Sequence, residues 1–514
     1  MNGTPDTYRT IHSVIAENAA RIPDKIYVHC IEQDKSITYG ELYALSNRMA
    51  HFLSDRGLGA NDRVLVLAEN SVEFMATFLG VLRYGATIAT ANVEMNRAHL
   101  GEIVHAVAPA LVLYQEGLGI EKLRTDGAPG DWMGFGDWAK GGGSTGFFAA
   151  LEPCSEADDI APVCGPQDIG VIFYTSGTES KPKGVLETHS GVWHNFDATA
   201  DCIRLGEDDR MLDCRSYTWL SAQNMSLGGP LTRGATVYMA KRFSQSRYFD
   251  WIRKFEINIG IAVPTVINML MNRPLDFDGG NTPHLRFMMT SSAPLSPEQW
   301  ERFEETYGIR LCQSYGCSEG GLMCSHRGTD RKIGSVGLPL KYQQIRITDA
   351  DGAPLAVGET GRIVVSGTQK SYGYLHHDGR IEKLPDHHHT GDLGYFDADG
   401  HVHITGRIRD VIIRGGVNIS PLEIDDVLAT HPDIAEAATV GVPDNIYGEE
   451  VVSYVVCRPG ASPSAESVIA HCGAALAEFK TPKQVFFRDT LPRNSRGKLD
   501  RAALAEVWKR ENAA

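Results

Sequence analysis

Residues 171–184 read VIFYTSGTESKPKG, an apolar run followed at once by hydroxyls, glycines and two lysines. Small residues let backbone N–H groups approach a phosphate, hydroxyl groups donate to it, and lysine ammonium groups supply positive charge. The spacing is not that of the P-loop, because the pattern G-x-x-x-x-G-K-[ST] does not fit here. Composition alone leaves two interpretations equally open, a phosphate-binding loop and a flexible polar turn.

Two further polar segments follow predicted strands in the same way. Residues 291–294, SSAP, come after the apolar strand 286–290, and residues 315–319, YGCSE, come after the apolar start of the segment 309–312. In an open α/β sheet, ligands bind at the carboxyl ends of the strands. Three polar loops at predicted strand ends therefore indicate one shared crevice.

The order of the predicted elements indicates an α/β protein of two domains, since 514 residues exceed what one hydrophobic core usually serves. Up to residue 406, short apolar runs alternate with helices, which is typical of parallel-rich sheets flanked by helices. This part includes a capping box at 38–41 and a helix over 72–84. We predict a large N-terminal domain over 1–408 and a small α+β C-terminal domain over 409–514. The elements predicted for the small domain are strand 411–413, helix 421–431, strands 435–442 and 451–457, helix 464–478 and strand 484–488.

Composition excludes several classes of protein. The 64 acidic residues outnumber the 49 Lys and Arg, giving a formal charge of −15, which argues against a nucleic-acid binder. The first ten residues lack the features of a secretory signal, and no apolar run is long enough to span a bilayer. Ten Cys without a C-x-x-C pair predict reduced, mostly buried thiols in a cytoplasmic protein. For His387–His389 we expect a solvated loop, because three adjacent side chains rarely converge on one metal ion.

With four later motifs, these segments resemble the adenylate-forming (AMP-binding) superfamily, which includes acyl- and aryl-CoA synthetases, non-ribosomal adenylation domains and firefly luciferase. The resemblance covers nearly the whole chain, in the family's motif order. The later motifs are Thr390-Gly391-Asp392, Gly406-Arg407, residues 414–419 (RGGVNI) and residues 491–498 (LPRNSRGK). The resemblance implies a large N-terminal domain, a small mobile C-terminal domain, and the substrates ATP, a carboxylic acid and coenzyme A.

The chemistry of that family explains its residue types. A carboxylate resists nucleophilic attack, so it first attacks the α-phosphate of ATP, giving a mixed anhydride and pyrophosphate. A thiol then displaces AMP, which is a good leaving group. Because the first step accumulates negative charge at phosphorus, catalysis should be mainly electrostatic stabilisation and positioning.

The resemblance implies a role for each motif. Ser318 would contact the α-phosphate, and Glu319 would hold Mg²⁺, a hard cation that prefers oxygen ligands. Lys498 would reach the carboxylate and the α-phosphate as a long, mobile ammonium. The implied nucleotide-binding residues are Thr175, Ser176, Gly177, Thr178 and Lys183 at the β- and γ-phosphates, Ser292, Ala293 and Pro294 at the adenine, Tyr315 stacked on it, and Asp392 with Arg407 at the ribose.

The implied coenzyme A side includes Arg409 as the hinge between the domains. Gly415, Gly416 and Asn418 would then lie beside the pantetheine tunnel. Without the motif, Asp392 and Arg407 would be interpreted as a surface ion pair, which contributes little, and Lys498 as a solvated charge.

Three departures from the family pattern stand out. Glu179 occupies the phosphate loop, where a carboxylate pointing inward would be unfavourable, so we expect it to face solvent. Residues 215–218, RSYT, replace the usual Pro-Leu-Phe-His run, and Arg409 stands where Asp or Lys is usual. These departures bear on ATP affinity and on acid specificity.

Three functions are weighed: an acid–CoA ligase, a stand-alone adenylation enzyme that loads a carrier protein, and a nucleotide-binding homologue without catalysis. No acidic residue is evidently placed to grip an amino acid's ammonium group, which favours the CoA ligase. Retained Lys498, Glu319 and Asp392 argue against loss of catalysis. The oligomeric state stays open, a homodimer included.

The acid itself is poorly specified by the sequence. By resemblance, the acyl pocket would draw on Tyr217, Thr218, Trp219 and Gly316. Two large aromatic side chains there favour a compact or aromatic acid over a long fatty chain. Arg215 is interpreted as a structural ion pair rather than as a partner of a second substrate carboxylate. Residues 314–316 and 328–332 also give a thin local similarity to crotonobetaine/carnitine-CoA ligases.

Overall fold

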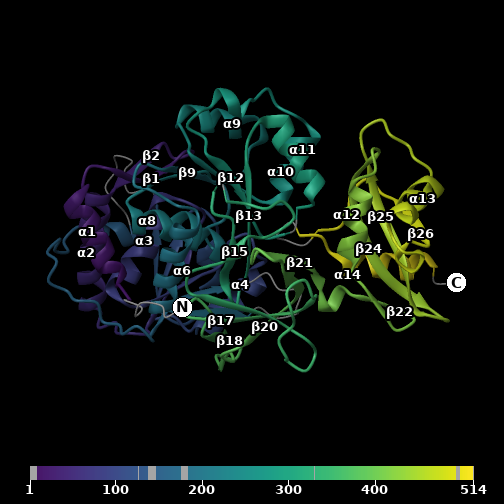
Figure 1. The fold of residues 1–514 in the computed structure, drawn as a ribbon. Helices are drawn as coiled ribbons and strands as arrows, with labels where there is room; N and C mark the ends of the chain where they lie inside the picture. The colour runs from purple at the N-terminus through teal and green to yellow at the C-terminus, as the bar shows by residue number, and fades with distance from the viewer. Residues whose placement is uncertain are drawn as a thin grey trace.

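The computed structural model describes residues 8–124, 127–136, 146–174, 183–293, 295–328, 330–493 and 498–512. Most of the chain forms one large unit built on three sheets, and the residues after Asp410 form a smaller unit beside it, at the right of Figure 1. The predicted α/β class and the division into a larger and a smaller part are confirmed.

Two large sheets dominate the first part of the chain. The nine-stranded sheet is parallel from β1 to β13 across its centre and antiparallel at both edges. The eight-stranded sheet is parallel among β3 to β7 and antiparallel beyond β7. In spatial order, the nine strands are β15 (Leu338–Pro339), β14 (Gly321–Ser325), β13 (Leu311–Cys317), β12 (Phe287–Thr290), β11 (Ile259–Ala262), β9 (Arg210–Asp213), β10 (Thr236–Met239), β1 (Ile26–Cys30) and β2 (Lys35–Thr38). The eight strands are β19 (Ile381–Lys383), β18 (Gly373–Leu375), β8 (Gly184–Thr188), β7 (Ile169–Tyr174), β4 (Thr87–Thr90), β3 (Arg63–Leu67), β5 (Leu111–Gln115) and β6 (Asp131–Phe135).

Helix α3 (Val72–Tyr84) lies between these two sheets. It contacts β1 and β2 of one sheet and β3 and β4 of the other, and every one of its residues is buried. Such a helix must be apolar on all sides, which its sequence VEFMATFLGVLRY largely provides. Its predicted bounds, 72–84, are confirmed, as is the capping box of Thr38 and Glu41 that begins α2 (Tyr39–Asp55).

Further helices cover the sheets. Helix α6 (His189–Cys202) also contacts both, through β7, β8 and β14. The other helices of this part are α1 (Ile11–Arg21), α4 (Arg97–Val107), α5 (Gly146–Leu151), α7 (Leu220–Ala222), α8 (Gly229–Arg233), α9 (Gln245–Lys254), α10 (Pro264–Asn272) and α11 (Pro297–Tyr307), with the π-helical segment η2 (Gln223–Gly228).

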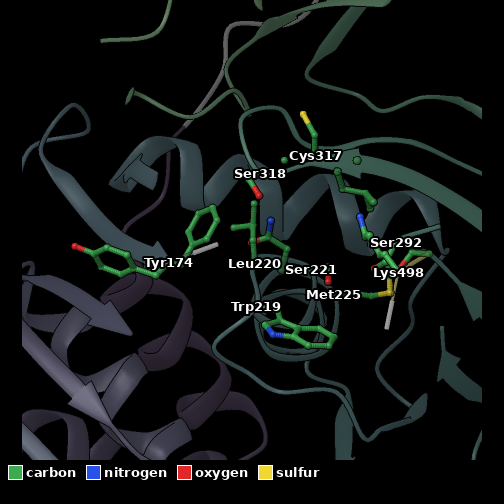
Figure 2. A pocket seen from close by; sticks show the side chains of 15 residues that line it. Tyr174, Trp219, Leu220, Ser221, Met225, Ser292, Cys317, Ser318 and Lys498 are labelled. Atoms are coloured by element: carbon green, nitrogen blue, oxygen red, sulfur yellow. The ribbon is translucent and has the colours of Figure 1, made fainter. Parts of the chain in front are cut away.

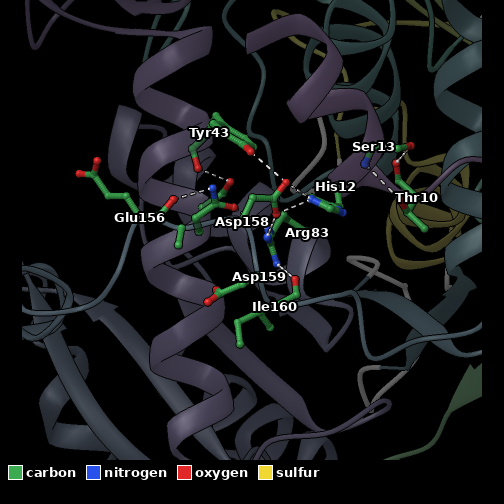
Figure 3. A network of polar contacts seen from close by, with 12 residues as sticks. Thr10, His12, Ser13, Tyr43, Arg83, Glu156, Asp158, Asp159 and Ile160 are labelled. Atoms are coloured by element: carbon green, nitrogen blue, oxygen red, sulfur yellow. Dashed lines mark hydrogen bonds and ion pairs between the residues drawn. The ribbon is translucent and has the colours of Figure 1, made fainter. Parts of the chain in front are cut away.

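An ion pair between Arg83 and Asp158 connects the loop that contains Asp158 to the helical layer of α1, α2 and α3. The fully buried guanidinium of Arg83 donates to Asp158 at 2.5 Å and to the carbonyl of Ile160 at 2.7 Å. Tyr43 donates to the same carboxylate at 2.8 Å, and His12 lies 2.7 Å from it (Figure 3). Burial raises the pKa of Asp158, but these partners more than offset it and leave that pKa below its ordinary value.

A four-stranded antiparallel sheet completes the larger part, and a five-stranded sheet forms the smaller one. The four strands are β16 (Gln343–Thr348), β17 (Gly361–Gly367), β20 (His388–Phe396) and β21 (Val402–Arg407). The five are β23 (Val417–Ile419), β22 (Ile412–Arg414), β25 (Gly448–Cys457), β24 (Ile434–Asp444) and β26 (Gln484–Phe487), covered by α12 (Pro421–Ala429), α13 (Ala465–Ala475) and α14 (Arg501–Asn512). One 3-10 turn, η4 (Ile408–Asp410), connects the last strand of one sheet to the first of the other.

Two expectations about loops are wrong. Tyr315, Gly316 and Cys317 belong to β13, because the strand continues past its apolar start and pairs with β14. His388 and His389 begin β20, which pairs with β17, so only His387 of the triplet lies outside a strand. The ten cysteines are free thiols, six of them buried, as predicted. No helix in the described part of the chain is both long and apolar enough to cross a membrane.

Candidate active site

A cavity of about 260 Å³ lies where the two parts of the chain meet. Its walls come from the ends of β12 and β13, from β20 and β21, from η4 and α12, and from the residues at the start of α14. Eight of the predicted site residues line it: Ser292, Ala293, Tyr315, Gly316, Asp392, Arg407, Arg409 and Lys498. Two of the three polar segments predicted at strand ends, 291–294 and 315–319, thus contribute to one cavity, whereas residues 175–182 of the third lie outside the described part of the chain.

Asp392 is a buried carboxylate on the wall of this cavity. It is 5% exposed, and its Oδ1 lies 3.0 Å from Nε of Arg407 on the paired strand β21. The phenol of Tyr315 donates to Oδ2 at 2.6 Å. Burial, with the charge of Asp392 adding to it, raises the pKa of Tyr315 well above its ordinary value, so the phenol stays a donor. Asp392 and Arg407 therefore form an ion pair on a cavity wall.

Ser292 adopts an unusual backbone conformation at the end of β12. Its φ is +82°, in the left-handed region that non-glycine residues rarely occupy. Strained residues of this kind concentrate at binding sites, where the surrounding structure holds them in place. Ser292 lines both this cavity and the next one.

A second cavity, of about 110 Å³, adjoins the first and shares Ser292, Gly316 and Lys498 with it. Figure 2 shows its wall, with Trp219 below, Ser318 above, and Ser292 and Lys498 on the right. Lys498 is the only ionic side chain among the described residues that line this cavity. The ammonium group of Lys498 thus stands at the junction of the two cavities.

The wall of the second cavity that comes from α7 and η2 was not found from sequence. Asn224 in the π-helical segment η2 is 3% exposed, and its Nδ2 has no hydrogen-bond partner among the described residues. The hydroxyl of Ser291, which follows β12 and is 4% exposed, also lines this cavity and likewise has no partner among the described residues. π-helical turns are frequent at functional sites. The polar pair Gln223-Asn224 inside an otherwise mostly apolar helical run was the available sequence signal.

The four residues predicted for the acyl pocket separate into two pairs. Trp219 and Gly316 line the second cavity. Tyr217 and Thr218 are buried but do not line it; Tyr217 belongs to the large core between the sheets. The RSYT segment thus brings Trp219, which directly follows it, to the cavity.

Arg215 forms a structural ion pair, as interpreted from the sequence. Its Nη2 lies 2.8 Å from Oδ2 of Asp213, both side chains are almost fully buried, and its Nη1 donates to Ser221 at 3.1 Å. Burial lowers the pKa of Arg215, but Asp213 outweighs burial and leaves it raised, so the charge stays compensated internally.

The turn that contains Ser318 and Glu319 joins β13 to β14. The phenol of Tyr374 donates to Oε1 of Glu319 at 2.7 Å. A protein Mg²⁺ site commonly takes one or two carboxylates and completes its shell with substrate phosphates and water. Glu319 fits that donor set, and Mg²⁺ held there would supply neutralising charge at the phosphates of bound ATP.

Cys317, Glu319 and His388 form a cluster beside this turn. Their ligand atoms all lie within 4.8 Å of one another. Burial is the main cause that lowers the pKa of His388, so its imidazole is neutral. A mixed sulfur, nitrogen and oxygen set suits softer ions than Mg²⁺.

The remaining predicted residues lie elsewhere. Gly415 and Gly416 have φ of +58° and +82° and form the two-residue turn between β22 and β23, which requires positive φ at both positions. With Asn418 they are exposed and line neither cavity. Lys183 directly precedes β8. Thr175, Ser176, Gly177, Thr178, Glu179 and Pro294 lie outside the described residues.

Comparison with protein families decides the assignment of this site. The model of the AMP-binding enzyme family matches residues 15–375, and that of the AMP-binding enzyme C-terminal domain matches residues 423–498. The chain belongs to the AMP-binding enzyme family. The resemblance drawn from the motifs is therefore confirmed.

Relatives within this family are CoA ligases. The sulfoacetate–CoA ligase of Cupriavidus necator is 32% identical over 516 residues, which cover 97% of this chain and 98% of the relative. The oxalate–CoA ligase of Arabidopsis thaliana is 30% identical over 517 residues, again 97% and 98%. ATP-bound MatB from Rhodopseudomonas palustris superposes with a TM-score of 0.87 at 27% identity, covering 97% of this chain and 99% of that structure.

These relationships give the activity of the chain. It is an ATP-dependent, AMP-forming carboxylic acid–CoA ligase, and its reaction uses ATP, Mg²⁺ and coenzyme A. The acid is first converted to an acyl adenylate and then to a thioester. Of the three functions weighed from sequence, the first is correct.

Proposed function

We propose that the acid is compact, carries one carboxylate and presents a hydrogen-bond acceptor to Asn224. The supporting observation is the second cavity, whose wall combines apolar side chains with Asn224, a residue whose amide Nδ2 has no hydrogen-bond partner among the described residues. At about 30 Å³ for each water-sized group, its volume of about 110 Å³ holds roughly four such groups. A long fatty chain exceeds this space.

The charges around the cavity favour a single carboxylate. Lys498 is the one ionic side chain on the described part of the wall, and adenylation needs it at the reacting carboxylate. The guanidinium of Arg215, which donates to the lining residue Ser221, is compensated by Asp213. A second substrate anion would thus be buried without a partner, which is strongly unfavourable. Sulfoacetate and oxalate, the acids named for two relatives, both carry a second anion and should be poor substrates here.

The nucleotide would bind in the larger cavity, with the ribose hydroxyls on Asp392 and the adenine along Ser292, Ala293 and Tyr315. Attack of the carboxylate on the α-phosphate would place developing charge between Ser318 and Lys498, which suits electrostatic stabilisation by groups already in position. Pyrophosphate leaves in this step. In the second step, the thiol of coenzyme A displaces AMP from the acyl carbon.

The second step would use a different face of the smaller part. The hairpin with Gly415, Gly416 and Asn418 is exposed and lines neither cavity. Rotation about Arg409 in η4 would exchange Lys498 for that hairpin. We accordingly propose that the two domains divide at 408/409. The cytoplasmic location remains a prediction, and the oligomeric state stays open.

The proposal is tested with pairs of acids that share a skeleton and differ by one acceptor, such as a hydroxyl or keto oxygen. Release of AMP and pyrophosphate is measured with and without coenzyme A. Leaving the buried amide unpaired costs about 1–3 kcal/mol, so the acid with the acceptor should be preferred by about 5- to 150-fold in kcat/KM.

Asn224→Leu should abolish this preference while sparing the acid without the acceptor. Met225→Leu, on the same wall, is the control and should retain it. Equal kcat/KM for both members of every pair in the wild type would refute the role of Asn224. Efficient use of a dianionic acid would refute the single-carboxylate assignment.

A further inference from the structure

Glu187 is a buried carboxyl group directly behind the active-site turn. It lies on β8, is 1% exposed, and no described basic side chain lies within ion-pair distance of it. Its Oε1 is 2.6 Å from the hydroxyl of Ser371, and Asn195 donates to its Oε2 at 3.4 Å. A carboxyl group in such surroundings is held by two neutral polar partners.

Ser371 connects Glu187 to the turn of Ser318 and Glu319. Its hydroxyl oxygen lies 2.9 Å from the carbonyl oxygen of Ser318, and its backbone N–H donates to the carbonyl of Glu319 at 2.8 Å. Ser371 is itself fully buried. Two consecutive carbonyls of the turn are thus bound by one residue, which lines neither cavity.

A count of protons relates the state of Glu187 to the direction in which the Ser371 hydroxyl donates. The Ser371 hydroxyl has one hydrogen and two neighbouring oxygens, and the carbonyl of Ser318 can only accept. When the hydroxyl donates to that carbonyl, the 2.6 Å contact with Glu187 requires a proton from the carboxyl group. Burial, the main cause, raises the pKa of Glu187 to about 8, so the neutral acid is the form present at pH 7.

We propose that Glu187 is a positioning residue that acts through Ser371, and that its carboxylic acid proton keeps the Ser318–Glu319 turn in the geometry needed for adenylation. The inference rests on the roles proposed above for Ser318 and Glu319. When Glu187 ionises, the Ser371 hydroxyl donates its hydrogen bond to the carboxylate of Glu187 instead. The carbonyl of Ser318 then loses its donor.

The surroundings define the direction of the pH effect. Asn195 on α6 and Ser371 are neutral, and Lys370 is the charged group that acts on Glu187, lowering its pKa without cancelling the effect of burial. The relay is therefore complete below about pH 8 and is lost as the pH rises through that value. The rate of adenylation should therefore fall as the pH rises through about 8, and this fall is called the alkaline limb below.

The test follows the acid-dependent exchange of pyrophosphate into ATP from about pH 6.5 to about pH 9.5, because this half-reaction omits the titrating thiol of coenzyme A. Wild-type exchange should fall with a midpoint near 8. Glu187→Gln can donate to Ser371 through its amide but cannot ionise, so it should work within about threefold of wild type at pH 7 and lack the limb. Glu102→Gln, on the exposed surface of α4, should match the wild type.

The titration of a second carboxyl group must be distinguished from that of Glu187. Burial raises the pKa of Asp426, on the wall of the larger cavity, to about 7. Asp426→Asn, whatever its rate, should keep the limb near 8. Ser371→Ala removes the relay in both protonation states, so it should lower exchange at pH 7 and flatten the alkaline limb.

An infrared measurement tests the proton itself. The wild-type minus Glu187→Gln difference should contain the C=O stretching band of a protonated carboxylic acid at pH 7, and this band should vanish above the limb. Absence of the band, an unchanged limb in Glu187→Gln, or wild-type rate and limb in Ser371→Ala would each overturn the proposal. Full exchange activity in Glu319→Gln would instead refute the role of the turn and leave the band unaffected.

Discussion

Replacing Asp392 by Asn tests how the nucleotide is held. The carboxylate accepts from Tyr315 at 2.6 Å and pairs with Arg407 at 3.0 Å, and the side chain is 5% exposed. Asn preserves the shape but removes the charge, and only one of its two terminal atoms accepts hydrogen bonds. The ribose hydroxyls would lose their charged acceptor, and one of the two protein donors would lose its partner.

The expected loss follows from the strength of such contacts. A hydrogen bond to a charged group contributes about 1.5–3 kcal/mol, which corresponds to about a 10- to 150-fold weaker Kd for ATP. The ribose is remote from the reacting carboxylate and phosphorus. The substitution should therefore raise the KM for ATP much more than it lowers kcat, as expected for binding that is equal in ground and transition states.

Calorimetry of ATP binding and the pyrophosphate-exchange assay measure these quantities. Asp410→Asn is the matched control, since it removes a carboxylate from the same cavity wall that is 26% exposed and only loosely paired with Arg409. A thermal melt establishes that both variants fold. A Kd for ATP within twofold of wild type in Asp392→Asn would refute the ribose contact, and an equal loss in both variants would indicate a general charge effect.

Three further outcomes are expected. Arg409→Pro fixes φ near −65° and should slow thioester formation while sparing adenylation, whereas Lys498→Ala should slow adenylation and spare thioester formation. Rapid-quench measurements of both half-reactions test this prediction, and equal slowing of both steps in both variants would contradict it. At the cluster of Cys317, Glu319 and His388, bound Co²⁺ should give a thiolate charge-transfer band, and Zn²⁺ should inhibit the enzyme in competition with Mg²⁺; Cys317→Ser and His388→Phe should each weaken both effects. A band that persists in both variants would exclude this cluster as the binding site of the ion. Arg83→Ala, which removes a buried guanidinium from three acceptors, should lower the free energy of unfolding in urea by about 3–5 kcal/mol; a loss below about 1 kcal/mol would mean that the network is replaceable.

Where local chemistry determines structure, the sequence was sufficient. The capping box of Thr38 and Glu41 depends on residues three apart, and the bounds of α3 follow from an apolar run that ends at Gly85, whose φ is +99°. The shared crevice was also predictable, because parallel strands bring their carboxyl ends to one edge. The order of motifs then added the family and its chemistry.

Where distant segments decide structure, the sequence was not sufficient. Residues 315–317 look like a polar loop until β14 pairs with them. The unpartnered amide of Asn224 is apparent only once η2 has closed one wall of the cavity. Glu187 and Ser371 are 184 positions apart, and neither has a local feature that distinguishes it from an ordinary strand or loop residue.

The way the site is divided between the two parts of the chain bears on how the intermediate survives. In the larger part, Asp392, Ser318 and the walls of the second cavity are held by buried contacts within that part. The smaller part adds Lys498 at the junction of the cavities. Rotation about η4 would therefore withdraw one cation while leaving the ribose and acyl contacts in place. In the proposed mechanism, adenylation needs that cation for charge developing at phosphorus and thioester formation does not. The motion that opens a path for the thiol would therefore also remove the group that favours the reverse reaction with pyrophosphate.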